Sequence, residues 1–218
     1  MATDQLQIYN GALQKIGKGR IASLSVNEEA RRELDSVWND GGVQYCLEQG
    51  MWKFATRSQM LDYDPSITPE FGYRRAFAKP DDWCATVAVC SDEFFKVPIL
   101  RYSDEAGYIM CDLDRIYVRF TSNDASWGMN LARWPATFTE YVKTYFAGRV
   151  CLKLTGDEKK ANEFNKPRGY VELAESTAKN NDAQDDPVKF PAPSSWILAR
   201  RNLKSPWRDG GNRSRLIG

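Results

Sequence analysis

Two helical segments that lie far apart in the sequence constrain this fold more than any other feature. Residues 8–55 and residues 134–164 carry apolar side chains at helical spacing, whereas the residues between them alternate as strands do. Each helical segment has a broad apolar face that must be buried, most simply against the other segment. We therefore expect an α+β fold, in which a helical bundle built from the N- and C-terminal segments carries an inserted antiparallel β-sheet or sandwich.

The expected domain boundaries follow the changes of pattern along the 218 residues. Residues 1–55 and 130–180 are expected to form the helical bundle domain, and residues 56–129 the inserted β domain. Residues 181–218 are polar and then basic, with spaced prolines that favour extended structure. They are expected to form an extended basic C-terminal arm.

Capping residues and glycines predict where the N-terminal helices begin and end. Ser25 and Glu28 have the spacing of a capping box, in which a hydroxyl and a carboxylate satisfy free backbone amides. They are expected to open a helix. Gly41 and Gly42 each cost a helix roughly 1 kcal/mol relative to alanine, so we expect a break there and a resumed helix over residues 43–47.

The middle of the chain predicts strands. Four prolines between residues 65 and 98 rule out long helices there. The alternation over residues 71–122 predicts an antiparallel sheet or small sandwich. Residues 113–114 are short enough to join strands at 108–112 and 115–121 in a tight hairpin.

The C-terminal helical segment carries similar signals. Pro135 lies near its expected first turn, and Thr137 with Glu140 has the spacing of a second capping box. Pro167 and Gly169 interrupt the later helical pattern, and a proline inside a helix costs about 3 kcal/mol. We therefore expect two helices there and not one continuous rod.

The chain contains no histidine, which narrows its chemistry. The Ser-His-Asp and Cys-His nucleophiles, the HExxH zinc site and the histidine general base are all excluded. An enzyme built on carboxylates alone, such as a glycosidase, survives this test. Asp81, Asp82 and Asp114 are the acids that such an enzyme could use. The sequence marks no particular carboxylate pair, so we expect no enzymatic activity and no cofactor.

The cysteine pattern and the hydropathy indicate a reduced environment and no membrane span. The chain has five widely spaced cysteines, none of them in a CxxC pair: Cys46, Cys84, Cys90, Cys111 and Cys151. This pattern predicts reduced thiols and no zinc site. No apolar run reaches 18 residues, and the first residues have no apolar signal core, so we expect folding in a cytoplasm.

The basic arm is the most informative feature outside the expected core. Residues 191–218 hold six basic side chains, one acidic side chain and two tryptophans. A solvated tail, a nucleic-acid contact and a docking segment for a protein are three interpretations. The tryptophans and the near-neutral formal net charge of +1 favour the protein partner. The predicted partner-binding residues are Trp196, Arg200, Arg201, Trp207 and Arg208.

Short motifs in a fixed order are spread over about three quarters of the chain. They are Asn10-x-Ala12-Leu13-x-x-Ile16-Gly17, Ile21-x-Ser23-Leu24, Glu29-Ala30-x-Arg32, Trp52-x-Phe54-Ala55, Tyr73-Arg74-x-Ala76, Pro80-x-Asp82, Trp134-Pro135 and Leu154-Thr155-Gly156-Asp157. In this order and spacing the chain resembles the head-to-tail adaptor (connector) proteins of short-tailed phages, the tail tubular protein A group. The sequence departs from that pattern at Gly41-Gly42 and at Pro167, where uninterrupted helix is expected.

The resemblance implies a structural virion protein at the head–tail junction. Such proteins form a homo-oligomeric ring, usually dodecameric, between the portal protein and the tail nozzle, which is built by a tail tubular protein B-like partner. Genomic DNA passes through the central channel without sequence-specific binding. The arm would dock on the portal or on a neighbouring subunit, and the β insertion would face the nozzle.

Two alternative functions stay open at the level of sequence. One is a carboxylate-based cell-wall hydrolase carried in the virion, which would need one of the acids named above. The other is a DNA-binding packaging accessory, which predicts salt-dependent affinity for duplex DNA carried by the arm.

Overall fold

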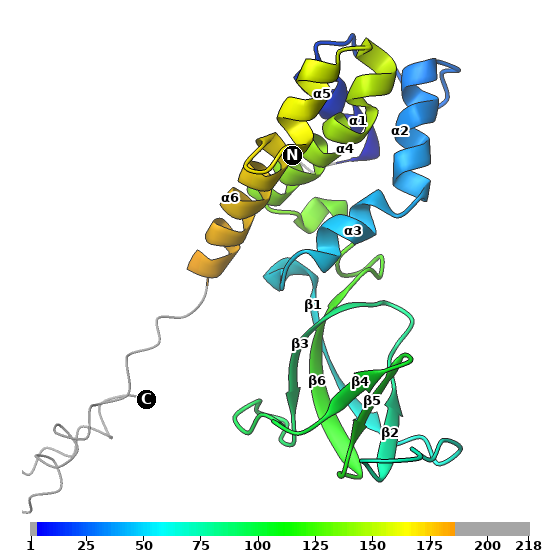
Figure 1. Ribbon diagram of the computed structural model, residues 1–218, viewed down its shortest axis with the longest axis vertical. Coiled ribbons are helices and arrows are strands. Elements are labelled where there is room, and N and C mark those ends of the chain that lie inside the picture. The colour runs from blue at the N-terminus through cyan, green and yellow to red at the C-terminus, as the bar shows by residue number, and fades with distance from the viewer. Residues whose placement is uncertain (1–3, 186–218) are drawn as a thin grey trace, which may run out of the picture. The chain divides into compact units, whose positions relative to one another are not determined.

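The computed structural model describes residues 4–185 and has an α+β fold, which confirms the predicted fold class (Figure 1). The helices are α1 (Gln5–Ile16), α2 (Glu29–Asn39), α3 (Gly42–Glu48), α4 (Ala136–Thr155), α5 (Glu158–Asn165) and α6 (Tyr170–Gln184). The strands are β1 (Thr56–Asp62), β2 (Arg75–Ala78), β3 (Trp83–Cys90), β4 (Ser103–Glu105), β5 (Tyr108–Cys111) and β6 (Arg115–Ser122). Two single-turn 3-10 helices, Lys53–Ala55 and Leu131–Arg133, lie where the chain passes between the helical and the strand regions.

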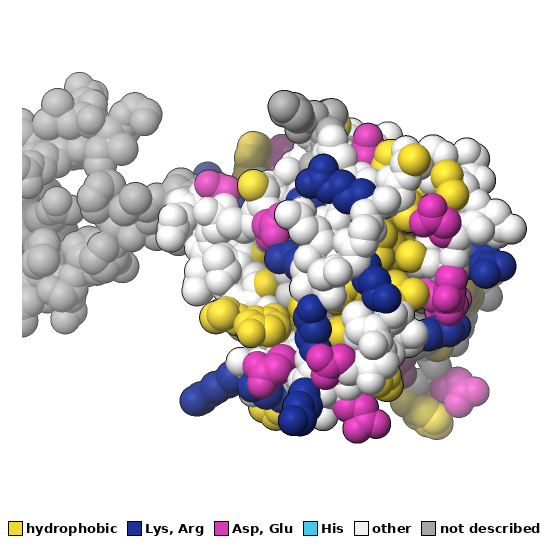
Figure 2. Space-filling model, turned by 90° about the horizontal axis from the view of Figure 1, so that it is seen from above, with side chains coloured by type: hydrophobic (Ala, Val, Ile, Leu, Met, Phe, Trp, Pro, Cys, Tyr) yellow, Lys and Arg dark blue, Asp and Glu magenta, His cyan; other side chains and the backbone are white. Residues whose placement is uncertain are grey.

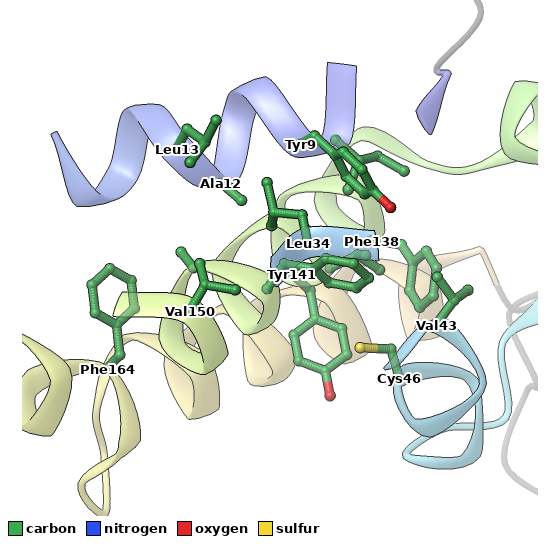
Figure 3. Packing of buried hydrophobic residues seen from close by; sticks show 14 of the residues in the cluster. Tyr9, Ala12, Leu13, Leu34, Val43, Cys46, Phe138, Tyr141, Val150 and Phe164 are labelled. Atoms are coloured by element: carbon green, nitrogen blue, oxygen red, sulfur yellow. The ribbon is translucent and has the colours of Figure 1, made fainter. Parts of the chain in front are cut away.

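The six helices form what we call the helical body, and α4 lies at its centre. Helix α4 contacts α1, α2, α3, α5 and α6, and buried side chains cover both of its sides. Figure 3 shows Phe164 of α5 beside Val150 of α4, in the same core as Leu13 of α1. Helices from the two ends of the chain therefore share one hydrophobic core, as their apolar faces require.

Aromatic rings fill the end of this core that lies nearest to the strands. The ring of Phe138 lies 4.8 Å from that of Trp52, 4.8 Å from that of Phe54 and 4.9 Å from that of Trp134, measured between centroids. Trp134 also donates from its Nε1 to the carbonyl of Gly128 at 2.7 Å. The segments that enter and leave the strand region are thereby held against α4.

The predicted helix breaks are confirmed. Helix α2 ends before Gly41, which has a φ of 82°, and α3 begins at Gly42. Such a φ is favourable only for glycine, so Gly41 can turn the chain between the two helices. The interruption at Pro167 likewise separates α5 from α6.

Both predicted capping boxes are wrong. Glu28 itself occupies the N-cap position of α2 and makes no capping bond, while the hydroxyl of Ser25 lies 2.8 Å from that of Ser23. Helix α4 begins after Pro135 without a side-chain cap. Glu140 instead pairs with Lys15 at 3.0 Å and with Lys143 at 2.8 Å. In each box, a polar side chain that the motif assigned to the backbone contacts another side chain: Ser25 contacts Ser23, and Glu140 contacts Lys15.

The strands form what we call the β lobe, which has two three-stranded antiparallel sheets with the orders β1-β6-β3 and β2-β5-β4. The sheet region begins at Thr56, earlier than the expected residue 71. A second hydrophobic core lies within the lobe and contains Leu61, Phe77, Val89, Ile109, Cys111, Ile116, Val118 and Phe120. The two cores are distinct sets of residues.

The predicted hairpin across residues 113–114 is wrong. Strand β5 pairs with β2 and β4, whereas β6 pairs with β1 and β3, so the short connection carries the chain from one sheet to the other. Asp112 accepts a hydrogen bond from the backbone of Arg74 at 3.1 Å, and Asp114 pairs with Arg75 at 2.9 Å. These bonds tie the connection to β2 and its approach, and not into a turn between β5 and β6.

Candidate binding surfaces

The predicted partner-binding residues, Trp196, Arg200, Arg201, Trp207 and Arg208, lie outside the described residues. The described residues carry two apolar surfaces that the sequence analysis did not single out. One lies on the helical body and the other on the β lobe.

The first surface is a groove of about 720 Å³ formed mainly by α4, α5 and α6, which we call the helical groove. Its apolar wall consists of Phe164, Tyr170, Leu173 and Ala174. Phe164 is buried, and its ring meets that of Tyr170 edge-on at 5.3 Å between centroids. Tyr170 is 51% exposed and Leu173 is 63% exposed, so large apolar side chains face solvent here.

Close packing of α5 against α4 fixes the base of the helical groove. A Cβ added at Gly148 would lie 3.1 Å from the Oδ1 atom of Asn165 and 3.3 Å from the Cβ of Phe164. Asn165 donates from its Nδ2 to the carbonyl of Gly148 at 3.3 Å and to that of Ala161 at 3.0 Å. The wall that carries Phe164 is therefore held in place by both packing and hydrogen bonds.

The charged residues at the rim of the helical groove are paired with protein groups. Partial burial would raise the pKa of Glu140, but hydrogen bonds from Lys143 and Lys15 outweigh it and lower that pKa below its usual value. Lys160 donates from its Nζ to the carbonyl of Ile16 at 2.7 Å, and Glu163 pairs with Lys166 at 2.7 Å. The apolar wall is therefore the part of the groove that a binding partner could contact.

The second surface consists of three exposed apolar side chains in the loop after β3, which we call the loop-tip patch. They are Phe94, Val97 and Leu100, with exposed fractions of 69%, 56% and 92%. Single exposed apolar residues are ordinary, but several large ones in neighbouring loop positions are typical of an interaction surface.

Specific contacts hold the loop that carries this patch. The carboxylate of Asp92 accepts hydrogen bonds from the backbone amides of Val97 at 2.8 Å and Lys96 at 3.0 Å, and these bonds lower its pKa. Phe95 has a φ of 54°, uncommon for such a side chain, and the guanidinium of Arg119 lies 3.9 Å from its ring centroid. The loop is therefore built to a defined shape that leaves Phe94 and Val97 in solvent.

The candidate acids of the hydrolase hypothesis are dispersed in structural roles or on the surface. Partial burial would raise the pKa of Asp82, but hydrogen bonds from Ser122 and Arg57 outweigh it and lower that pKa. The pair with Arg57 spans 2.8 Å. Asp114 pairs with Arg75, and Asp81 is exposed. A glycosidase general acid needs a raised pKa, so Asp82 has the opposite tuning.

Figure 2 shows one face of the molecule, on which basic and acidic side chains are interspersed with apolar ones. Within residues 4–185 no cluster of cysteine, aspartate or glutamate side chains could hold a metal ion, and no helix has the length and apolar character to cross a membrane. No protein-family model matches the chain, and no curated protein matches it either.

The loop-tip patch left a weak trace in the sequence. The run from Phe94 to Leu100 places five large apolar residues around Pro98, without the alternation of a half-buried strand. A proline in such a run argues against a central strand. The helical groove left no comparable signal, because Tyr170 and Leu173 have the same helical spacing as residues that are buried.

Proposed function

We propose that this protein is a structural head-to-tail adaptor of a short-tailed phage, located in the virion at the junction of head and tail. The observation that carries this proposal is the presence of two apolar surfaces built on two separate hydrophobic cores. A ring subunit that also binds a further partner needs separate surfaces for its neighbour and for that partner. The motif resemblance supplies the class of partner.

In this proposal the subunits form a closed ring, dodecameric as in the proteins that the chain resembles. A side-to-side contact between unlike surfaces closes into a ring when the rotation from one subunit to the next is a whole-number fraction of a full turn. The formal net charge of +1 keeps electrostatic repulsion between crowded copies low. Genomic DNA passes through the centre without sequence-specific binding, and no enzymatic activity is required of the chain.

Each end of the subunit has its own partner. The β lobe presents the loop-tip patch to the tail nozzle, which fits a loop that is held by Asp92 while its apolar side chains remain exposed. The C-terminal segment binds the portal through Trp207 and Arg208, an aromatic anchor beside a charged group of the kind enriched at interface hot spots.

The experiment is a separation of the two partners by mutation. A chain that lacks residues 191–218 keeps every described helix and strand and should lose association with the portal ring in a co-sedimentation assay. A chain with both Phe94→Asp and Leu100→Asp should still bind the portal and should no longer bind the nozzle. Leu152→Asp, at an exposed position of α4, is the matched control and should bind both the portal and the nozzle. Normal portal binding by the shortened chain would contradict the proposed role of the arm.

A further inference from the structure

We propose that the helical groove is the receptor for the C-terminal segment of a second copy of this chain, with Trp196 as its main anchor. This inference rests on the proposed function, because it identifies the contact between neighbouring subunits of the ring. The part of the C-terminal segment around Trp196 then binds the groove, and the part around Trp207 binds the portal.

The shape and chemistry of the helical groove fit a large apolar anchor. Its volume of about 720 Å³ exceeds what one side chain fills, and its wall is apolar along Phe164, Tyr170 and Leu173. The sequence after the last described helix supplies such anchors at close spacing. Within nine positions it holds Phe190, Trp196, Ile197 and Leu198.

Charge complementarity favours this segment as the occupant. Residues 1–185 contain 23 basic and 27 acidic side chains, whereas residues 186–218 contain seven basic and two acidic ones. The acids that line the groove are Glu140 and Glu163, each paired with lysine side chains of the helical body. Arg200 and Arg201 follow Trp196 by four and five residues, a reach of roughly 13–18 Å in extended chain, which is enough to reach this rim.

The direction of α6 favours a second copy over the same chain. The groove is lined by Tyr170, Leu173, Ala174 and Thr177, which belong to the first half of α6. The chain leaves α6 at Gln184, roughly 10 Å beyond Thr177 along the helix axis. Pro187, Pro191 and Pro193 follow and favour extended chain over a return. Trp196 lies eleven positions after Asp185, a span of up to roughly 36 Å, which is enough to reach across a neighbouring helical body.

The first test is complementation between two full-length variants. Leu173→Glu changes the groove at a residue that is 63% exposed, and Trp196→Ala removes the anchor. Sedimentation velocity over a concentration series should show self-association for the wild type. For each variant alone, the protein concentration at the midpoint of self-association should rise at least about tenfold. Mixing the two variants should restore association, but only to a one-to-one dimer, because each pair retains one intact groove and one intact anchor. Leu152→Glu is the matched control and should associate as the wild type does.

The second test identifies the contact directly. A photo-reactive amino acid at position 173 of the full-length chain, irradiated in an equal mixture of ¹⁵N-labelled and unlabelled copies, should link to the peptide that carries Trp196. About half of these links should join unlike isotopes. Links within one isotope only would mean that the chain fills its own groove, and the absence of any link at the highest concentration would mean that the segment binds elsewhere. Either outcome overturns the inference.

The two tests separate this inference from the proposed function. Portal co-sedimentation depends on Trp207 and nozzle binding on the loop-tip patch, so both can persist when the complementation fails. In that case the subunit contact is wrong and the adaptor proposal stands. Complementation without portal or nozzle binding would show the reverse.

Discussion

The helical body and the β lobe place their apolar residues in different ways. The core of the helical body contains 23 buried residues from both ends of the chain, whereas the core of the β lobe contains eight. The lobe nevertheless exposes Phe71 and Leu100 almost fully, and Phe94 by 69%. The comparison indicates that the helical body supplies most of the stability of the fold, while the β lobe leaves several large apolar side chains exposed to solvent.

The largest expected effect comes from removing the aromatic centre of the helical body. Phe138→Ala should lower the free energy of unfolding by about 3–5 kcal/mol, because the ring is 1% exposed and leaves a cavity among three other aromatic rings. Urea denaturation followed by far-UV circular dichroism measures this. Phe94→Ala, at an exposed position, is the control and should change stability by less than about 0.5 kcal/mol.

A substitution in the smaller core sharpens the comparison. Ile109→Ala, in the central strand of the β2-β5-β4 sheet, should cost about 2–5 kcal/mol because the side chain is fully buried. Hydrogen exchange should show loss of protection in the β lobe, with the amides of α1 and α4 still protected. Equal loss in both regions would mean that the two cores open as one unit.

Asp82 tests the contribution of a single paired carboxylate to the lobe. Asp82→Asn should cost on the order of 1 kcal/mol near neutral pH, because it weakens the bonds from Arg57 and Ser122. Since the folded pKa of Asp82 lies below its unfolded value of about 3.9, the ionised group stabilises the protein above that value. This contribution is lost as the pH falls through the folded pKa.

The pH dependence of that difference is the measurement. Urea midpoints of the wild type and the Asp82→Asn chain should differ at pH 7 and converge in strong acid. A difference that stays constant with pH would show that the substitution acts through packing and not through the charge.

The smallest expected effect on stability belongs to the loop-tip patch. Leu100→Asp should leave the thermal midpoint almost unchanged, since the side chain is 92% exposed and surface substitutions usually stay within about 0.5 kcal/mol. A marked loss of stability would mean that the patch supports the lobe, and the contrast between the two regions would then fail.

The helical body could be predicted from sequence because its signals are local. Apolar spacing identified the helices, and Gly41 and Pro167 marked breaks that depend only on backbone geometry. The capping boxes failed because other side chains took their polar groups, and the hydroxyl of Ser25 lies 2.8 Å from that of Ser23. Lys15, from another helix, takes the carboxylate of Glu140 that the motif assigned to the start of α4.

The topology of the β lobe and the binding surfaces could not be predicted in the same way. The pairing of β5 with β2 and of β6 with β1 depends on long-range contacts, and alternation alone fits a hairpin equally well. The helical groove exists because α6 leaves Leu173 uncovered, which the spacing of that residue does not reveal. The five residues that the sequence did propose lie beyond residue 185, outside the described residues.

Negative-stain electron microscopy of the full-length chain, alone and with the portal ring of the same phage, tests the adaptor proposal most directly. The proposal predicts an added ring of side-by-side copies on one face of the portal, with the β lobes turned away from it. Portal rings that remain bare at saturating concentrations of the chain would contradict the proposal.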